Sequence, residues 1–170
     1  MLSIVLSFVG CYDLKYFRHY PTRDLLSKGV KVKDFSRLSM FVAEGVLFYP
    51  RMITLSDSNS SPYSHLFLGS ELETEIYLCE ATLKAEDGKL LSLVKIDKTI
   101  LVDNKAESGL YQAEGVPLFD TQNVDVSQLL KHNNVFLDVY YSTCDKGLDP
   151  RKKISFKLEK REVKEISWST

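Results

Sequence analysis

The segment that decides the fold runs from Glu71 to Asp103 and reads ELETEIYLCEATLK, then AEDG, then KLLSLVKIDKTILVD. Two apolar runs flank a short acidic turn that ends at Gly88, and its Asp-Gly pair supplies the positive φ that a tight hairpin needs. Each run carries apolar residues on both faces, which is typical of a strand covered on both sides. We therefore expect a central β-hairpin. The opposing sets are Ile76 and Leu78 against Tyr77, Cys79, Ala81 and Leu83 in the first run, and Leu91 and Leu93 against Val94 and Ile96 in the second.

The remaining segments also favour extended structure. Short alternating runs separated by turn residues, with few helical segments between them, predict an all-β domain. The fold class expected for residues 1–170 is a single-domain antiparallel β-sandwich or partly open barrel with two or three short helices. Expected strands are Leu2–Val9 ended by Gly10, Val46–Tyr49 ended by Pro50, Met52–Leu55, Val116–Phe119, Val135–Tyr141 and Ile154–Leu158; expected helices start near Thr22, within Asp34–Glu44, and at Asp125 or Ser127.

Composition limits the class of protein. With 44% hydrophobic residues the chain can bury a full core, which excludes disorder. A net charge of −1 argues against a protein devoted to the nucleic-acid backbone. Three widely spaced cysteines form no disulfide framework and no zinc spacing, so we expect a reducing, cytoplasmic setting. The apolar start, residues 1–9, is expected to be a strand rather than a signal segment, because no Lys or Arg precedes it.

An acidic cluster precedes the first run of the hairpin. Glu71, Glu73 and Glu75 alternate onto one face of an extended strand, with Glu80 further along. Carboxylates that crowd together make one of them a candidate general acid or base. The simpler interpretation is a solvated strand end, which we favour.

The Glu73-Thr74-Glu75 sequence followed by Ile-Tyr-Leu resembles the Glu-x-Glu strand of mono-ADP-ribosyltransferases. The resemblance implies an NAD-dependent enzyme in which Glu75 orients the nicotinamide ribose. It also implies an upstream residue, Arg18 or His19, that contacts NAD. The catalytic residues of this alternative are Glu73, Glu75 and Arg18, and its cofactor is NAD.

Two segments have the composition of a partner surface. Residues 151–164 are locally basic, and Lys157 and Arg161 share the exposed side of a predicted strand with Ser155 and Glu159. The segment around residues 12–20 is an aromatic patch of Tyr12, Tyr16, Phe17 and Tyr20 with Arg18 among them. Tyrosine and arginine are residue types that interface cores favour. The simpler interpretation, which we favour, is a solvated edge strand for residues 151–164 and core packing for residues 12–20. The predicted partner-binding residues are Tyr16, Phe17, Arg18, Tyr20, Arg151, Lys153, Lys157 and Arg161.

The other polar residues indicate no reaction centre. The three histidines are too far apart for an HxH or HExxH metal site, and no glycine cluster matches a phosphate-binding loop. We therefore expect no metal and no cofactor. The function favoured by the sequence is a non-enzymatic binding protein that acts through loops and an edge strand, with another protein as its partner. The alternatives are the NAD-dependent transferase and a nucleic-acid binder that uses the basic C-terminal strands.

Overall fold

The computed structural model describes residues 10–19, 41–55, 63–107, 109–119, 122–142 and 152–167. This part of the chain contains eleven strands and a single short helix, so the expectation of a mostly β protein is confirmed. The strands are β1 (Gly10–His19), β2 (Val42–Ala43), β3 (Val46–Leu55), β4 (Tyr63–Ser70), β5 (Thr74–Ala85), β6 (Leu90–Val102), β7 (Asn104–Lys105), β8 (Tyr111–Gln112), β9 (Val116–Pro117), β10 (Asn134–Ser142) and β11 (Lys152–Ser167), and the helix is α3 (Val126–Leu129).

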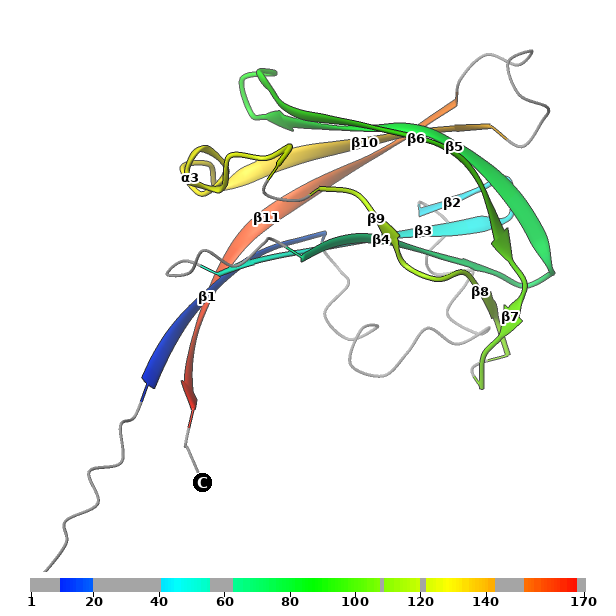
Figure 1. The fold of residues 1–170 in the computed structure, drawn as a ribbon, viewed down its shortest axis with the longest axis horizontal. Coiled ribbons are helices and arrows are strands. Elements are labelled where there is room, and N and C mark those ends of the chain that lie inside the picture. The colour runs from blue at the N-terminus through cyan, green and yellow to red at the C-terminus, as the bar shows by residue number, and fades with distance from the viewer. Residues whose placement is uncertain are drawn as a thin grey trace, which may run out of the picture.

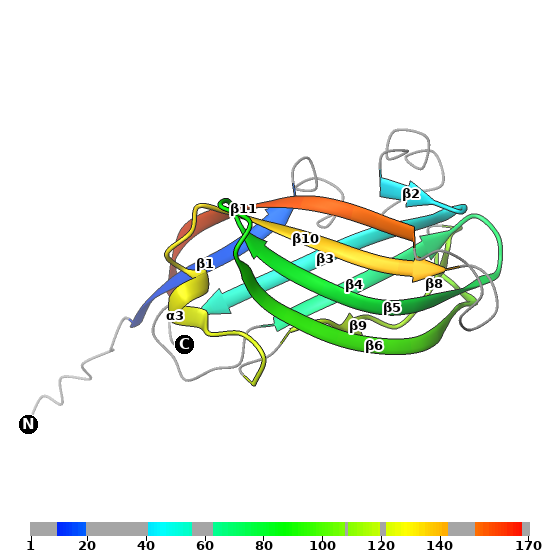
Figure 2. The same cartoon turned by 90° about the horizontal axis from the view of Figure 1, so that it is seen from above.

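All the described strands are hydrogen-bonded in the order β6-β5-β10-β11-β1-β3-β4-β8-β7, with β2 on β3 and β9 on β4. Every pairing is antiparallel. The chain forms two facing layers, with β5, β6 and β10 in one and β3 and β4 in the other (Figure 1). Strand β11 joins them, because its first half pairs with β10 and its second half with β1. Figure 2 shows β11, β10, β5 and β6 side by side in one layer.

The hydrophobic core fills the space between the layers. Alternate residues of β10 and β11 point inward, as the sequence predicted: Val135, Leu137 and Val139 are each 0% exposed. Aromatic rings join the layers, and the ring centroids of Phe48 on β3 and Tyr141 on β10 lie 5.0 Å apart. The remaining inward residues of β11 are Ile154, Phe156 and Leu158, and those of β4 include Leu66 and Leu68.

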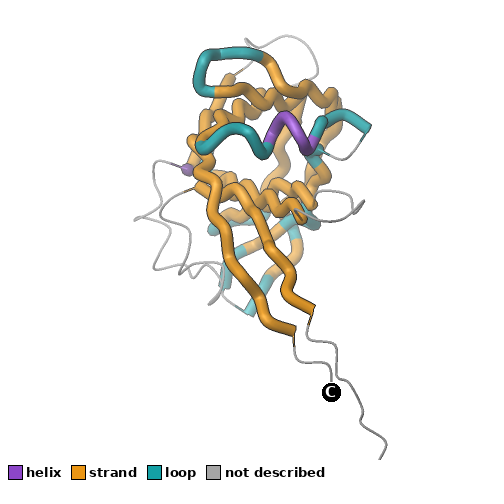
Figure 3. Tube along the Cα trace, turned by 90° about the vertical axis from the view of Figure 1, so that its left-hand side faces the viewer, coloured by secondary structure: helices purple, strands orange, loops and turns teal. Residues whose placement is uncertain are grey.

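Helix α3 crosses one end of the layers (Figure 3). Its start was predicted correctly: Asp125 is the N-cap, and its carboxylate accepts hydrogen bonds from the backbone N–H groups of Ser127 and Gln128. Leu129 is 1% exposed and anchors the helix to the core. The helix is short, and its position depends on the cap, on Leu129 and Leu130, and on the hydrogen bond that Lys160 Nζ donates to the Leu130 carbonyl oxygen at 2.9 Å.

The predicted central hairpin is confirmed as β5 and β6, but the predicted division of its faces is wrong. Against β10, strand β5 carries an extra residue at Cys79, between Leu78 and Glu80, whereas against β6 the extra residue at this level lies on β6. Such a bulge adds one residue and so exchanges the two faces of a strand. Leu78 therefore points into the core before the bulge, and Ala81 and Leu83 point into the same core after it. The core-facing residues of β5 are therefore even-numbered before the bulge and odd-numbered after it. Without knowledge of the bulge, this change makes both faces of the strand look buried.

The sequence predicted that Pro50 interrupts a strand, but this prediction is wrong, because β3 runs continuously through Pro50. On one side of β3, the pairing with β2 covers residues 46–47 and the pairing with β1 covers residues 51–55. Pro50 falls in the gap between these two pairings. A residue without an N–H group is tolerated where no neighbouring strand needs one.

Other expectations are corrected in the same way. Gly10 begins β1 instead of ending a strand, and β4 has no counterpart among the predicted strands. The prediction of two or three helices is not confirmed: the described residues contain only α3, and Val42–Ala43 is a strand. The predicted helix near Thr22 and the predicted strand at residues 2–9 lie outside the described residues. None of the described helical residues forms a span long and apolar enough to cross a membrane.

The turn of the central hairpin offers a test of the fold. Gly88 has a φ of 82°, and a Cβ atom at this position meets nothing within 4 Å. Gly88→Ala should therefore lower the free energy of unfolding by about 1 kcal/mol through backbone strain alone. Chemical denaturation measures this change. Gly69→Ala is the control, because Gly69 lies in β4 without a positive φ and with only ordinary contacts; equal losses in both variants would contradict the assigned turn.

Candidate functional site

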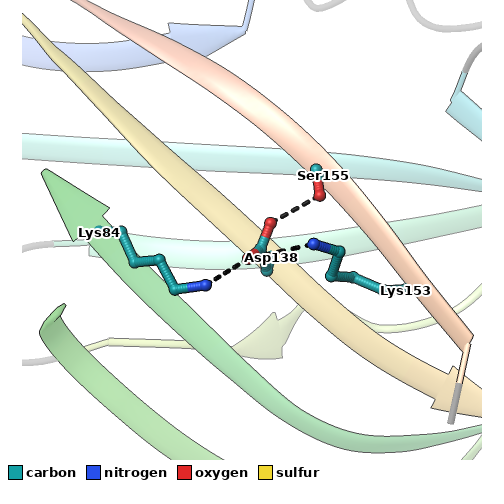
Figure 4. A network of polar contacts seen from close by, with 4 residues as sticks. All are labelled: Lys84, Asp138, Lys153 and Ser155. Atoms are coloured by element: carbon teal, nitrogen blue, oxygen red, sulfur yellow. Dashed lines mark hydrogen bonds and ion pairs between the residues drawn. The ribbon is translucent and has the colours of Figure 1, made fainter. Parts of the chain in front are cut away.

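The most highly organised polar group in the described chain is centred on Asp138, in the middle of β10. Its side chain lies on the face of the sheet opposite the core, between β5 and β11 (Figure 4). Lys84 Nζ donates to Asp138 Oδ2 at 2.8 Å, and Ser155 Oγ donates to Oδ1 at 2.6 Å. Lys153 Nζ lies 3.7 Å from Oδ2. Asp138 is only 5% exposed, because these neighbours cover it.

The electrostatics of this group favour a charged carboxylate. Burial raises the pKa of Asp138, but hydrogen bonds from Lys84 and Ser155 and the charge of Lys153 outweigh that effect and hold the pKa below its usual value. The hydrogen bond to Asp138 also raises the pKa of Lys84. The network therefore fixes two lysines on the outer face. We interpret these interactions as holding the two lysine side chains in place and not as a centre for proton transfer.

Strand β11 carries the predicted basic residues on this same outer face. Lys153, Lys157 and Arg161 are exposed and alternate with the buried side of the strand, as predicted. The expectation of an edge strand is wrong, because β11 pairs with β10 on one side and β1 on the other. Arg161 forms an exposed ion pair with Glu159 at 2.8 Å. Arg151 lies outside the described residues.

The register brings the two predicted partner segments together. Tyr16 of β1 stands opposite Arg161 of β11, Phe17 opposite Lys160, and Arg18 opposite Glu159. Tyr20 lies outside the described residues. Residues that are about 140 positions apart in the sequence thus occupy neighbouring strands.

Aromatic residues of β10 complete the outer face. Phe136 stands opposite Lys157, and Tyr140 stands opposite Lys153. Phe136 is 36% exposed, which is unusual for a phenylalanine in the middle of a sheet. We call the surface of residues 136, 140, 153, 157 and 161 the outer-face patch. It combines Phe136, Tyr140 and Arg161, residue types that interface cores favour, with two lysines that can steer an acidic partner.

The residues of the transferase alternative are not brought together. Glu73 and Glu75 are exposed at the start of β5, and Glu75 stands opposite Leu101 of β6. Arg18 lies three strands away, level with Asn134 at the other end of β10. At about 3.3 Å per residue, this difference in level of ten residues is roughly 33 Å along the strands. Glu71 is exposed before β5 and Glu80 is half-buried beyond the bulge, so the four glutamates do not form one cluster.

No group of three metal-ligating side chains occurs within the residues that the structure describes. His65 lies on β4 against Phe67, with ring centroids 6.3 Å apart. Its pKa is lowered by burial and by the nearby charge of Arg51. His65 therefore belongs to a packed cluster of side chains.

A groove that the sequence did not reveal runs along β6. It has a volume of about 800 Å³ and lies between β6 and the chain that forms β8 and β9. In the described part of the sheet, β6 pairs only with β5, so its other backbone edge faces this groove. The lining residues are Val94, Lys95, Ile96, Lys98, Thr99, Ile100, Leu101, Asp103, Asn104, Gln112, Glu114, Gly115, Val116 and Pro117.

Comparisons of this chain with protein-family models, with curated proteins and with solved structures found no match.

The Asp138 network predicts a specific dependence of stability on pH. Asp138→Asn should lower the free energy of unfolding by about 2 kcal/mol at neutral pH, since it removes charged hydrogen bonds. A depressed folded-state pKa stabilises the fold above the unfolded-state pKa of about 4, and this stabilisation is lost as the pH falls through the folded-state value. The wild type should therefore approach the variant on acidification.

Urea denaturation at neutral pH and at about pH 2 measures both proteins under conditions that bracket this titration. Asp103→Asn is the matched control, because Asp103 is exposed at the end of β6. It should behave like the wild type at both pH values. A stability difference between wild type and Asp138→Asn that stays constant with pH would contradict the assigned charge network.

Proposed function

We propose that this chain is a non-enzymatic binding protein that docks another protein on its outer-face patch. The observation that supports this proposal is the register of β11, which aligns exposed Lys157 with Phe136 and Arg161 with Tyr16. Exposed aromatic and cationic residues on a rigid sheet lose little conformational entropy on binding. The Arg161–Glu159 ion pair is exposed and contributes at most about 1 kcal/mol, so a carboxylate of a partner can replace it.

We propose in addition that the fold is a partly open barrel rather than a sandwich of two separate sheets. Hydrogen bonds run without interruption from β6 to β7 through the described strands, and the groove occupies the interval between β6 and β8–β9. The single-domain organisation of residues 1–170 and the cytoplasmic location stay predictions.

The separation of Glu75 and Arg18 argues against the transferase alternative. The nucleic-acid alternative is weakened by the carboxylate of Asp138, which neutralises part of the charge of Lys84 and Lys153. Both alternatives remain distinct outcomes of the experiments below.

Charge reversal tests the proposed surface. The double variant Lys157→Glu and Arg161→Glu should lose at least about tenfold of its affinity for the protein partner, because it converts two attractions into two repulsions. Quantitative affinity capture with the tagged chain, followed by titration of the captured protein, measures this loss. Lys89→Glu with Lys131→Glu makes the same change of net charge elsewhere on the exposed surface.

A partner retained equally by the wild type and both double variants would exclude the outer-face patch. A captured nucleic acid, with affinity that falls steeply as salt is raised, would support the nucleic-acid alternative instead.

A second prediction separates the binding protein from the transferase. NAD should leave the melting temperature unchanged, since the geometry assembles no NAD site from Glu73, Glu75 and Arg18. Differential scanning fluorimetry with NAD, and an assay of nicotinamide release, measure this. Any release of nicotinamide that Glu75→Gln abolishes without loss of folding would overturn the proposal.

A further inference from the structure

The groove beside β6 runs along side chains that face the core without being fully covered by it. The even-numbered positions of β6 face inward, because Val94 stands opposite Ala81, a core residue that is 0% exposed. At one end of this row Val102 is also 0% exposed, whereas Val94 and Ile96 are only half-buried. Part of the apolar inner face of the sheet is therefore open where the groove runs.

The opposite wall of the groove is formed by the chain of β8 and β9. Val116 of β9 is 7% exposed and belongs to the core, and Pro117 beside it is exposed. The groove therefore has apolar residues on both walls. Its volume of about 800 Å³ lies within the range of roughly 300–1,000 Å³ that is typical of small-molecule sites, which also occur at the mouths of β-barrels. Size and lining both fit a small molecule with an apolar body.

The backbone edge of β6 is interrupted in the middle of the groove. Asp97 has a φ of 46°, and the hydroxyl of Tyr77 donates a hydrogen bond to its carboxylate. At this level β6 also carries an extra residue relative to β5. An added strand needs a regular row of N–H and C=O groups to pair with. The edge therefore favours a small molecule over an extended peptide or the β6 strand of a second copy.

The charges of the lining balance each other. They belong to two lysines, Lys95 and Lys98, and to two carboxylates, Asp103 and Glu114. Within the described part of the chain, none of the four forms an ion pair or a side-chain hydrogen bond. A ligand with a net charge meets a repulsion here as well as an attraction. An uncharged hydroxyl or amide group, in contrast, accepts a hydrogen bond from a lysine and donates one to a carboxylate.

We infer that the groove binds a small uncharged amphiphile, a molecule with an apolar body and one hydroxyl or amide group. The apolar body covers Val94 and Ile96, and burial of this apolar surface supplies the affinity. The polar group hydrogen-bonds to Lys98, which belongs to the inward row of β6, or to Glu114 on the other wall. The site lies outside the outer-face patch, so the inference goes beyond the proposed function and does not depend on it.

The test uses three small molecules that share an octyl chain: octanol, octanoate and octylammonium. In the full chain, octanol should shift the backbone amide NMR signals of residues 94–100 and 112–117, which contain most of the groove lining. Octanol should also bind at least about fivefold more tightly than either charged molecule, because each charged group meets a like charge in the groove. NMR titrations measure the three affinities.

The inner face of β6 is tested by Ile96→Gln, which should lower the affinity for octanol at least about fivefold, because the apolar body then lies against a polar group. Ile96→Trp fills the same space with an apolar ring and should lower the affinity as well, so it tests the site even where Ile96→Gln fails to fold. Leu93→Gln is the matched control, because Leu93 is 44% exposed and faces outward, opposite Thr82. Melting temperatures confirm the folding of each variant.

The charge balance is tested by neutralising one wall at a time. Lys98→Gln should turn the preference toward octylammonium, because Glu114 then attracts a cation without a competing lysine on the inner face. Glu114→Gln should turn the preference toward octanoate for the converse reason. Both side chains are exposed, so neither variant should change the melting temperature. Lys89→Gln, in the hairpin turn outside the groove, should keep the preference for octanol.

Several outcomes would overturn the inference. They are the absence of groove shifts with octanol, tightest binding of a charged molecule by the wild type, an unchanged preference in both charge variants, and equal losses in Ile96→Gln and Leu93→Gln. Shifts of the same amides when the protein concentration alone is raised, together with a dimer in sedimentation, would assign the groove to a second copy instead. The Lys157 and Arg161 variant should bind octanol like the wild type, so failure of the outer-face patch and failure of the groove are separate results.

Discussion

The rest of the structure depends on strand β11, which pairs with β10 through its first half and with β1 through its second. This sixteen-residue strand pairs with β10 through Lys152–Glu159 and with β1 through Leu158–Ser167. Without it, the described strands separate into β6-β5-β10 and β1-β3-β4-β8-β7, two sheets that no other described strand joins by hydrogen bonds. Inward residues of β11, above all Phe156, contact this shared core, and its outward residues carry the cations of the outer-face patch. Core and candidate surface are thus the two sides of one strand.

The sequence predicted the elements whose apolar residues keep a period of two. The inward faces of β10 and of β11 as far as Leu158 follow that period, so these stretches and their orientation were foreseen. The central hairpin was foreseen as well, but its buried face was not, because the bulge at Cys79 exists only in the register against β10. Strand β4 was not predicted, because its alternating pattern is hidden in the sequence. Its buried Leu66 and Leu68 alternate, but the half-buried His65 and Phe67 between them conceal the pattern.

The candidate sites were foreseen only where composition alone marked them. Exposed cations on β11 were predicted correctly, yet that strand was expected at an edge, and position in a sheet is a long-range property that no local pattern encodes. Asp138 resembles an ordinary solvent-facing residue in VFLDVYY, and its burial arises from Lys84 and Lys153 on two other strands. The groove along β6 is likewise the product of strand order. Residue types indicated the chemistry, and register decided where it was assembled.

Charge balance explains why the two candidate surfaces differ in what they can bind. On the outer face, the buried carboxylate of Asp138 compensates Lys84 and Lys153. A partner of the outer-face patch must therefore compete with Glu159 for Arg161 and pack against the exposed Phe136. At the β6 edge, no buried carboxylate plays that role, and Lys98 stands opposite an apolar residue. The two surfaces lie on different parts of the sheet, β10–β11–β1 and the outer edge of β6, with β5 between them. A single extended partner can therefore contact both only by crossing β5, whereas two partners can bind without competing for the same residues.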